Sequence, residues 1–418
     1  METSAAELYA EREKRFNDIV ALKKPDRVPV IPIVNHYFPT KLKGISNKDA
    51  GYDSALRYRA LTESTVEFGW DFTPTNGMFA ADGYAALGTT QLRWPGGDLP
   101  DAASFQFVED EYLKADEYDE FLSDPNGFTL TKIFPRIAGN LQGFAQVPIP
   151  PLFWMANTYY LMNVGGALLA APPIRSALES LLAMSDAVAG YFAADAANAQ
   201  EMAALGYPRT WGAPVIPAFD VVSDMFRSLR GSTLDMYRHP EQLLATIDLV
   251  QEAQIGLAKM VMQITGNPRV FIPMHRGAGG FMSDEQFEKF YWPTFKGLVL
   301  AIIEAGGVPN PLFEGDYTPR LKYLAEFPPG KVAGHFDKID RVKFKEVLGD
   351  KMCFWGNVPV SLLCTGTPRQ VKDDVKELID LFGDTGTLML DSGLGVPDEA
   401  RPENLHALRE AAEEYGVF

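Results

Sequence analysis

Short apolar runs alternate with longer amphipathic stretches through the C-terminal half of the chain. The apolar runs lie at residues 269–274, 308–313, 331–334, 352–355 and 387–390. Runs of this length that end in glycine or polar residues are typical of buried strands, and the stretches between them are long enough for helices. The pattern therefore predicts five strand–helix units, which is typical of a parallel sheet with helices outside it.

The N-terminal half supplies fewer units of this kind. Residues 28–34 and 70–73 have strand patterns, and one of two middle segments, 144–149 or 214–219, supplies an eighth strand. Eight units favour an α/β fold with a closed (β/α)8 TIM-type barrel over an open sheet. Residues 76–235 are too irregular for simple units, so we expect a large insertion there that partly covers the mouth of the barrel.

The composition is that of a large acidic enzyme. The 418 residues include 38 Lys and Arg against 55 Asp and Glu, which gives a net charge of −17. This length would allow two or three domains, but no low-complexity linker divides the sequence, so we expect a single domain over residues 1–418. An acidic surface repels phosphate backbones and disfavours a substrate with many carboxylates, so nucleic acid is not an expected partner.

The cysteines and the N-terminus restrict the chemistry and the location. Cys353 and Cys364 are too few for a disulfide framework or a cysteine-rich zinc site. The N-terminal segment is charged and has no apolar signal-peptide core, which predicts a cytoplasmic protein.

One long stretch, residues 137–174, contains no Asp, Glu, Lys or Arg. Its length would allow a transmembrane helix, but its prolines and amide side chains break a spanning helix, so we expect no membrane span. The remaining interpretations are a buried core, an apolar cap over a binding chamber, or a subunit interface in a homo-oligomer.

Polar residues follow most of the predicted strands, at the end where catalysis takes place in a (β/α)8 barrel. Each of them could simply cap the next helix or bind loop amides. We expect several to converge on one pocket instead, because three of the chain's five histidines are among them. The candidate catalytic residues are His275, His335, Glu314 and Asp337, and the candidate substrate-binding residues are His36, Tyr37, Arg276, Asn357 and Asp391.

A carboxylate near several histidines is also a candidate metal site. Neutral imidazole is a common metal ligand, and a glutamate with two or three histidines suits zinc. The candidate ligands are Glu314, His36, His275 and His335. We expect neither cysteine to bind the metal, because Cys353 falls within a strand pattern and Cys364 within a turn.

A set of short motifs occurs in a fixed order over residues 25–75 and 225–418. The motifs are Arg27-Val28-Pro29-Val30, Phe287-Glu288-Lys289-Phe290-Tyr291-Trp292-Pro293, Gly356-Asn357-Val358-Pro359, Gly366-Thr367-Pro368 and Pro402-Glu403-Asn404-Leu405. This order resembles the uroporphyrinogen decarboxylase superfamily, which holds porphyrinogen decarboxylases and corrinoid-dependent methyltransferases. The resemblance implies a (β/α)8 barrel with its site at the carboxyl end of the strands.

The chain departs from the superfamily's patterns at two places. The decarboxylases carry an arginine-bearing segment after the first strand, which grips substrate carboxylates, whereas residues 33–38 here contain no arginine. The zinc-using methyltransferases carry a His-x-Cys pair and a later Gly-Cys-Gly turn, where this chain has Leu312-Phe313-Glu314-Gly315 and Gly393-Leu394-Gly395. A porphyrinogen substrate and a zinc-activated thiol are therefore both unexpected, and any metal would have nitrogen and oxygen ligands.

Two functions follow from the resemblance and these departures. The first is a methyltransferase that moves a methyl group between a small, apolar or aromatic substrate and a corrinoid carried on a separate protein. The alternative is a lyase that decarboxylates a small acid, in which Arg276 or Arg230 holds the carboxylate and a histidine protonates the carbanion. A barrel that binds a ligand without catalysis is a third possibility.

Overall fold

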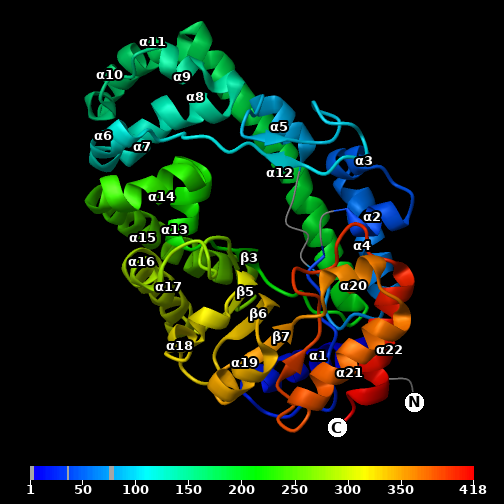
Figure 1. Cartoon of the computed structure of the whole chain (residues 1–418). Coiled ribbons are helices and arrows are strands. Elements are labelled where there is room, and N and C mark those ends of the chain that lie inside the picture. The colour runs from blue at the N-terminus through cyan, green and yellow to red at the C-terminus, as the bar shows by residue number, and fades with distance from the viewer. Residues whose placement is uncertain (1–3, 35–36, 75–79) are drawn as a thin grey trace.

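Six parallel strands form the sheet at the centre of the protein (Figure 1). The structure is a computed structural model, which describes residues 4–34, 37–74 and 80–418. The strands lie in chain order: β3 (Ala213–Pro214), β4 (Arg269–Met274), β5 (Val308–Asp316), β6 (Ala333–Lys338), β7 (Cys353–Gly356) and β8 (Leu388–Met389). Every neighbouring pair is parallel. This confirms the predicted parallel α/β arrangement.

Helices connect the strands on the outside of this sheet. They are α15 (Pro240–Thr265), α16 (Asp284–Gln286), α17 (Trp292–Glu304), α18 (Leu321–Leu324), α19 (Arg341–Leu348), α20 (Val360–Thr365), α21 (Pro368–Phe382) and α22 (Pro402–Tyr415). Helix α21 begins as its sequence indicates. Thr367 and Gln370 form a complete capping box ahead of Pro368 at the first helical position.

Two N-terminal segments with strand patterns lie in register with the parallel strands. Backbone hydrogen bonds join residues 29–31 to Leu390, and residue Asp71 to Val30. Thr73 in turn forms a parallel bridge with Arg209, just before β3. The eighth predicted strand falls at β3 rather than at residues 144–149, which belong to α9 (Gly143–Gln146) and the turn after it.

Alternate residues of the strands face two different cores. In β4, Val270, Ile272 and Met274 pack in the large cluster that includes the outer helices, while Phe271 packs in a second cluster. Helix α1 (Ala5–Val20) contributes to the second cluster and packs against the first residues of β6 and β7. Side chains that alternate with Val270, Ile272 and Met274, as Phe271 does, therefore line the inner face of the sheet. Because α1 packs at the first residues of the strands, the carboxyl ends of the strands lie at the opposite end of the sheet from α1.

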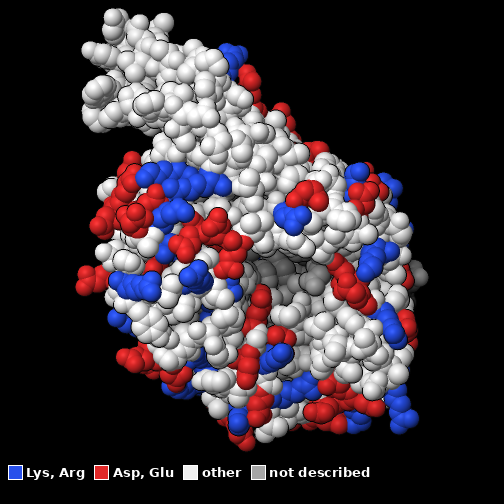
Figure 2. Space-filling view, turned by 45° about the horizontal axis from the view of Figure 1, so that its top comes forward, with Lys and Arg blue, Asp and Glu red and all other residues white. Residues whose placement is uncertain are grey.

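A helical lobe rises above the sheet in Figure 1 and is joined to it by the long helix α12. N-terminal helices α2 (Phe38–Leu42), α3 (Asn47–Tyr52) and α4 (Ser54–Glu67) lie on the side where α12 descends. The lobe and its connections comprise α5 (Ala81–Leu87), β1 (Leu92–Arg93), β2 (Gln106–Phe107), α6 (Tyr118–Ser123), α7 (Pro125–Phe128), α8 (Phe134–Ile137), α9, α10 (Thr158–Tyr160), α11 (Gly166–Ala170), α12 (Pro172–Ala204), α13 (Ala218–Val221) and α14 (Ser228–Arg238). Figure 2 shows the surface hollowed below this lobe. That residues 76–235 form one insertion into the barrel stays a prediction.

The charge-free stretch is a buried core only at its two ends, where Leu141, Phe144 and Ile174 pack in one cluster, so that interpretation was wrong for its middle. Phe153, Tyr159 and Met162 expose 71–73% of their surface. Among the described residues, no single helix is long and apolar enough to cross a membrane. One bent pair, Thr158–Ala170 with Pro172–Ala204, meets the length and composition requirement together, across an angle of 83°.

Candidate functional site

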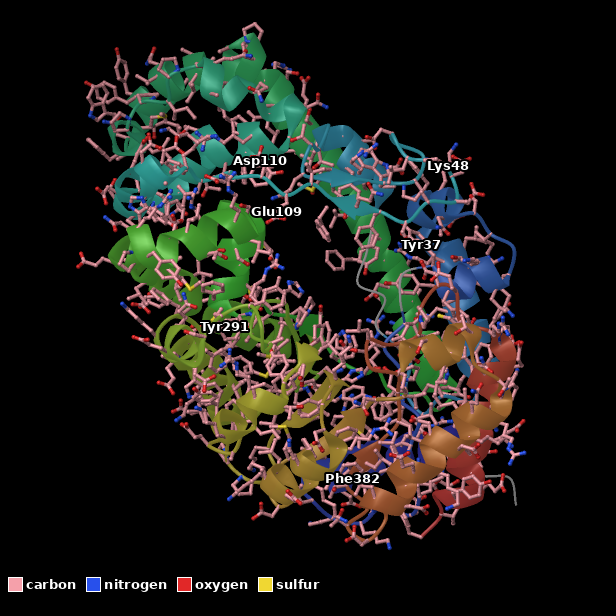
Figure 3. The ribbon with its side chains drawn as sticks, in the orientation of Figure 1. Tyr37, Lys48, Glu109, Asp110, Tyr291 and Phe382 are labelled. Atoms are coloured by element: carbon pink, nitrogen blue, oxygen red, sulfur yellow. The ribbon has the colours of Figure 1, made fainter. Side chains whose placement is uncertain are left out.

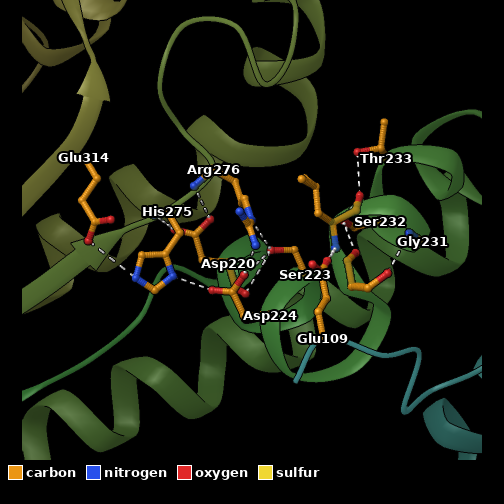
Figure 4. A network of polar contacts seen from close by, with 12 residues as sticks. Glu109, Asp220, Ser223, Asp224, Gly231, Ser232, Thr233, His275, Arg276 and Glu314 are labelled. Atoms are coloured by element: carbon orange, nitrogen blue, oxygen red, sulfur yellow. Dashed lines mark hydrogen bonds and ion pairs between the residues drawn. The ribbon is translucent and has the colours of Figure 1, made fainter. Parts of the chain in front are cut away.

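His275 lies between two carboxylates at the carboxyl end of β4 (Figure 4). Its Nδ1 atom lies 2.5 Å from Oδ2 of Asp224, and its Nε2 atom lies 3.7 Å from Oε1 of Glu314. Strand register explains the second contact. Pro273 of β4 pairs with Leu312 of β5, so the residues two positions further along, His275 and Glu314, leave the same face side by side.

Asp220 positions the backbone that carries His275. Its Oδ2 atom accepts hydrogen bonds from the His275 backbone N–H at 2.9 Å and from the Tyr291 hydroxyl at 2.8 Å. Its Oδ1 atom accepts one from the Arg276 backbone N–H at 3.1 Å. Asp220 is fully buried. Three donors converging on one buried carboxylate fix the direction in which the histidine leaves the strand.

Two π-helical turns flank the site. Asp224 lies on the turn Val222–Arg227, which follows α13, and Tyr291 ends the turn Phe287–Tyr291, which precedes α17. A π turn widens the helix and changes the direction of the side chains on it, and such turns occur often at functional sites. Here the first turn places Asp224 against the ring of His275 while Asp220 on α13 holds its backbone.

Arg276 binds the π-helical turn that carries Asp224. Its Nη2 atom donates to Oδ1 of Asp224 at 2.8 Å, and its Nε atom donates to the Ser223 hydroxyl at 3.2 Å. The guanidinium also lies over the ring of Phe281, 5.7 Å from its centroid. Asp224 thus bridges His275 and Arg276 and compensates the charge of both.

The carboxylates set the charge of His275. Burial alone would lower the pKa of its ring, but the hydrogen bond to Asp224 and the charges of Glu314 and Asp220 outweigh burial and raise that pKa to about 9. The ring is therefore an imidazolium at neutral pH. Burial raises the pKa of Asp220 to about 7, and burial also raises the pKa of Glu314 against the opposing charge of His275.

The site is open enough to receive a substrate. The side chains of His275 and Glu314 are about one third exposed, at 33% and 35%. Asp224 and Arg276, at 20% and 21%, lie deeper. The Nε2 atom is the accessible nitrogen of the ring, because Asp224 engages Nδ1. A proton held on Nε2 can thus be passed to a bound molecule.

Asp337 and Asn357 lie next to this centre on the following strands. Oδ2 of Asp337 accepts a hydrogen bond from the backbone N–H of Gly315, beside Glu314, at 3.0 Å. The Asn357 side chain donates to the Asp337 carbonyl at 3.1 Å and accepts from Nε of Arg341 at 2.9 Å. Asp337 therefore belongs to the site. Both polar atoms of the Asn357 amide bind protein groups, and its substrate contact stays a prediction.

His335 and Asp391 lie in the interior, where His335 Nε2 is 3.6 Å from Oδ2 of Asp391. Each exposes only 1% of its surface. His335 stacks on Trp355, and its Nε2 atom lies 2.8 Å from the Ser392 carbonyl. Burial lowers the pKa of His335 to about 4, so its ring is neutral. Asp391 accepts the Ile33 backbone N–H at 2.7 Å. These contacts indicate structural roles, and their predicted functional roles remain without a supporting contact.

Of the two residues predicted after the first strand, Tyr37 does not join the site. His36 lies outside the described residues. Tyr37 is buried, and its backbone N–H binds Asp398. It lines a small pocket with Tyr84 and Trp94. Figure 3 shows Tyr37 well apart from Tyr291.

The described residues do not form the predicted zinc site. Among residues 4–34, 37–74 and 80–418, no group of three His, Cys, Asp or Glu side chains is arranged to hold a metal ion. His275 and Glu314 lie together, whereas Nε2 of His335 binds the Ser392 carbonyl and His36 is outside the described residues. We therefore derive no step that requires zinc.

The sequence interpretation missed Asp220 and Asp224. Both lie within residues 76–235, which were assigned to the insertion rather than to a strand end. Their spacing of four residues places two carboxylates on one helical face, beside an apolar run, and this is the signal that would have found them. Nothing in the sequence shows that this face meets β4.

Replacing Asp224 by Asn should lower the pKa of His275, and with it the pH above which any activity that needs the protonated ring is lost. A raised pKa keeps His275 protonated until the pH rises through about 9. Asn removes the negative charge of Asp224 and weakens its hydrogen bond to Nδ1 of His275, so the pKa of His275 falls toward the ordinary histidine value of about 6.5. The pH profile of kcat/KM measures this shift. Asp380→Asn, at an exposed pair with Lys376, is the control. An unchanged alkaline limb in Asp224→Asn would show that Asp224 does not raise the pKa of His275.

A comparison with protein-family models identifies the family of the C-terminal half of the chain. A model of the uroporphyrinogen decarboxylase (URO-D) family matches residues 210–415, which include β3 to β8 and Asp220, Asp224, His275 and Glu314. Among solved structures, a methyltransferase from Methanosarcina mazei is similar over 99% of this chain and 99% of its own, with a TM-score of 0.63 and 16% identity. At that identity the likeness concerns the fold. No curated protein sequence matches the chain. Through its C-terminal half, the chain belongs to the uroporphyrinogen decarboxylase superfamily of enzymes.

Proposed function

We propose that this chain is a methyltransferase in which protonated His275 is the general acid. The observation that carries the proposal is the arrangement of the ring, with Nδ1 bound to Asp224 and Nε2 directed toward Glu314. When a methyl group leaves a heteroatom, the C–X bond breaks and its electron pair stays on X. The Nε2 proton neutralises X, and the imidazole becomes neutral. In the reverse direction the neutral ring removes the proton from X–H.

Glu314 completes the proton path. Its pKa is raised by burial, and its carboxyl group lies 3.7 Å from Nε2 and is partly exposed. It can therefore return a proton from solvent to the ring after each turnover. Asp224 and Asp220 are positioning residues in this scheme. Asp224 stabilises the imidazolium, and Asp220 holds the backbone of His275 and Arg276.

The charges of the site favour a neutral or cationic substrate. Four carboxyl groups, on Asp220, Asp224, Glu314 and Asp337, surround the cations of His275 and Arg276, and Lys338 acts on Asp337 alone among the four. The guanidinium of Arg276 already binds Asp224 and Ser223, so a substrate carboxylate would have to compete with them. The alternative, decarboxylation of a small acid, has less support for this reason. Phe281 and Met225, which are 41% and 40% exposed, offer apolar surface near the site.

We also infer that the parallel sheet closes into a (β/α)8 barrel. The hydrogen bonds of residues 29–31 with β8 and with Asp71, and those of Thr73 beside β3, support this closure. A corrinoid, which the family resemblance implies, would supply the cobalt that accepts or donates the methyl group. The hollow below the lobe is open to the outside in Figure 2, which suits a cofactor carried by a separate protein.

A methyl-transfer assay tests the proposal. The purified protein is incubated with methylcobalamin and three series of acceptors: neutral phenols, amines and carboxylic acids. The loss of methylcobalamin is followed by its visible spectrum, the methylated product by mass spectrometry, and carbon dioxide release in parallel. We expect methylated phenols or amines. Carbon dioxide released from the acids without any methyl transfer would contradict the proposal and establish the lyase.

A further inference from the structure

The lobe ends in an exposed apolar surface, which we call the apolar tip. Its side chains expose 49–73% of their surface, and they lie between α9 and the start of α12. They are Leu152, Phe153, Trp154, Tyr159, Tyr160, Leu161, Met162 and Leu169. Figure 2 shows the end of the lobe almost without charged side chains, in contrast to the rest of the visible face.

The apolar tip is large enough to hold a stable contact. An aromatic side chain has about 150–250 Å² of surface, so the four aromatic side chains and the four Leu and Met side chains of the tip, each about half exposed or more, present on the order of 1,000 Å². A stable interface needs about 800 Å² from each partner. Contiguous exposed apolar patches of this size mark interaction sites rather than ordinary surface. Phe, Tyr, Trp and Met, which dominate this tip, are enriched at such interfaces.

We propose that the apolar tip is the contact surface between two copies of this chain. The net charge of −17 makes two copies repel each other over most of their surface. Residues 137–174 contain no charged side chain, so this tip is a face where two copies can meet without opposing like charges. A two-fold contact places the same patch on both sides, and an apolar aromatic patch is complementary to itself.

A membrane surface fits the same tip less well. Interfacial segments carry Lys and Arg that engage anionic headgroups, and residues 137–174 contain neither. The apolar exposure also continues past an 83° bend onto α12, where Leu182 is 66% exposed. A flat bilayer would contact the segment on one side of this bend, whereas a second protein can pack against the segments on both sides.

The mass of the protein in solution tests the proposal. Sedimentation equilibrium of the full chain should give a species of twice the 46.2 kDa chain mass, in equilibrium with monomer. Phe153→Glu and Met162→Glu should each raise the dissociation constant of the dimer by at least about tenfold, because each places a charge inside the interface.

Two matched controls separate the tip from exposed apolar residues elsewhere. Tyr237 on α14 and Ile264 on α15 are 73% and 74% exposed, as much as Phe153 and Met162. Tyr237→Glu and Ile264→Glu should leave the dimer unchanged. A monomeric wild type, or a dimer that the tip variants leave intact, would overturn the proposal. So would monomer that binds phosphatidylcholine vesicles through the tip, which would assign the surface to a membrane instead.

Discussion

Replacing His275 by Asn is expected to lower kcat for methyl transfer by about 10² to 10⁴, the usual contribution of a general acid. Asn keeps a donor near the position of Nδ1, toward Asp224, but has no group at the position of Nε2, which faces Glu314. The acid is therefore lost while the positioning contact is kept. We expect KM to change much less than kcat, because the proton is needed when the bond breaks.

The control for this variant is His239→Asn. His239 precedes α15 and lies against Tyr118, outside the site, so its replacement should leave kcat unchanged. An equal thermal unfolding midpoint for His275→Asn and wild type would show that the loss is chemical. A His275→Asn enzyme with wild-type kcat at neutral pH would contradict the role assigned to the ring.

Replacing Asp235 by Ala is expected to lower the free energy of unfolding by about 3–5 kcal/mol, the usual effect of removing one partner of a buried ion pair. Of its ion pairs in the described part of the chain, the buried Arg227 guanidinium would keep only the one with the partly exposed Glu111, at 3.0 Å. Arg227 and Asp235 are each only 2% exposed and form two hydrogen bonds, of 2.6 and 3.2 Å. The Tyr118 hydroxyl also donates to Asp235 at 2.8 Å, and the Arg227 guanidinium reaches the Leu113 carbonyl. The pair thus joins the lobe to the turn that carries Asp224.

Urea denaturation followed by circular dichroism measures the loss. The matched control is Asp380→Ala, which breaks an exposed pair with Lys376 and should cost far less, because solvent screens exposed ion pairs. Because Arg227 ends the π turn that holds Asp224, the folded fraction of Asp235→Ala should also lose activity. A cost as small as that of Asp380→Ala would show that the buried pair contributes little to stability.

Much of the fold could be predicted from the sequence, because strand and helix periods are local. The apolar runs at 269–274 and 308–313 are β4 and β5, and Thr367 caps α21 as its pattern indicates. The position of His275 and Glu314 followed from the rule that parallel strands end at one edge. That rule does not say how far along its strand a side chain lies. His335 is the third of the six residues of β6 and is buried.

Two features could not be predicted from local patterns. Asp220 and Asp224 reach His275 through tertiary packing of α13 against β4, which no spacing in the sequence encodes. The charge-free stretch at 137–174 was interpreted first as core. An apolar composition shows that a segment is stabilised by leaving water, but it does not show whether the same chain or another molecule covers it.

The protonation state of His275 tests the central claim most directly, and it requires no substrate. The chain has five histidines, so a nitrogen-15 NMR titration of histidine-labelled protein can resolve each ring, with His275→Asn identifying its signal. We predict a pKa of about 9 for His275, and a ring that is still neutral near pH 5 for His335, whose pKa is about 4. A His275 pKa at or below the ordinary value of about 6.5 would leave the ring neutral at pH 7 and would contradict its role as the general acid.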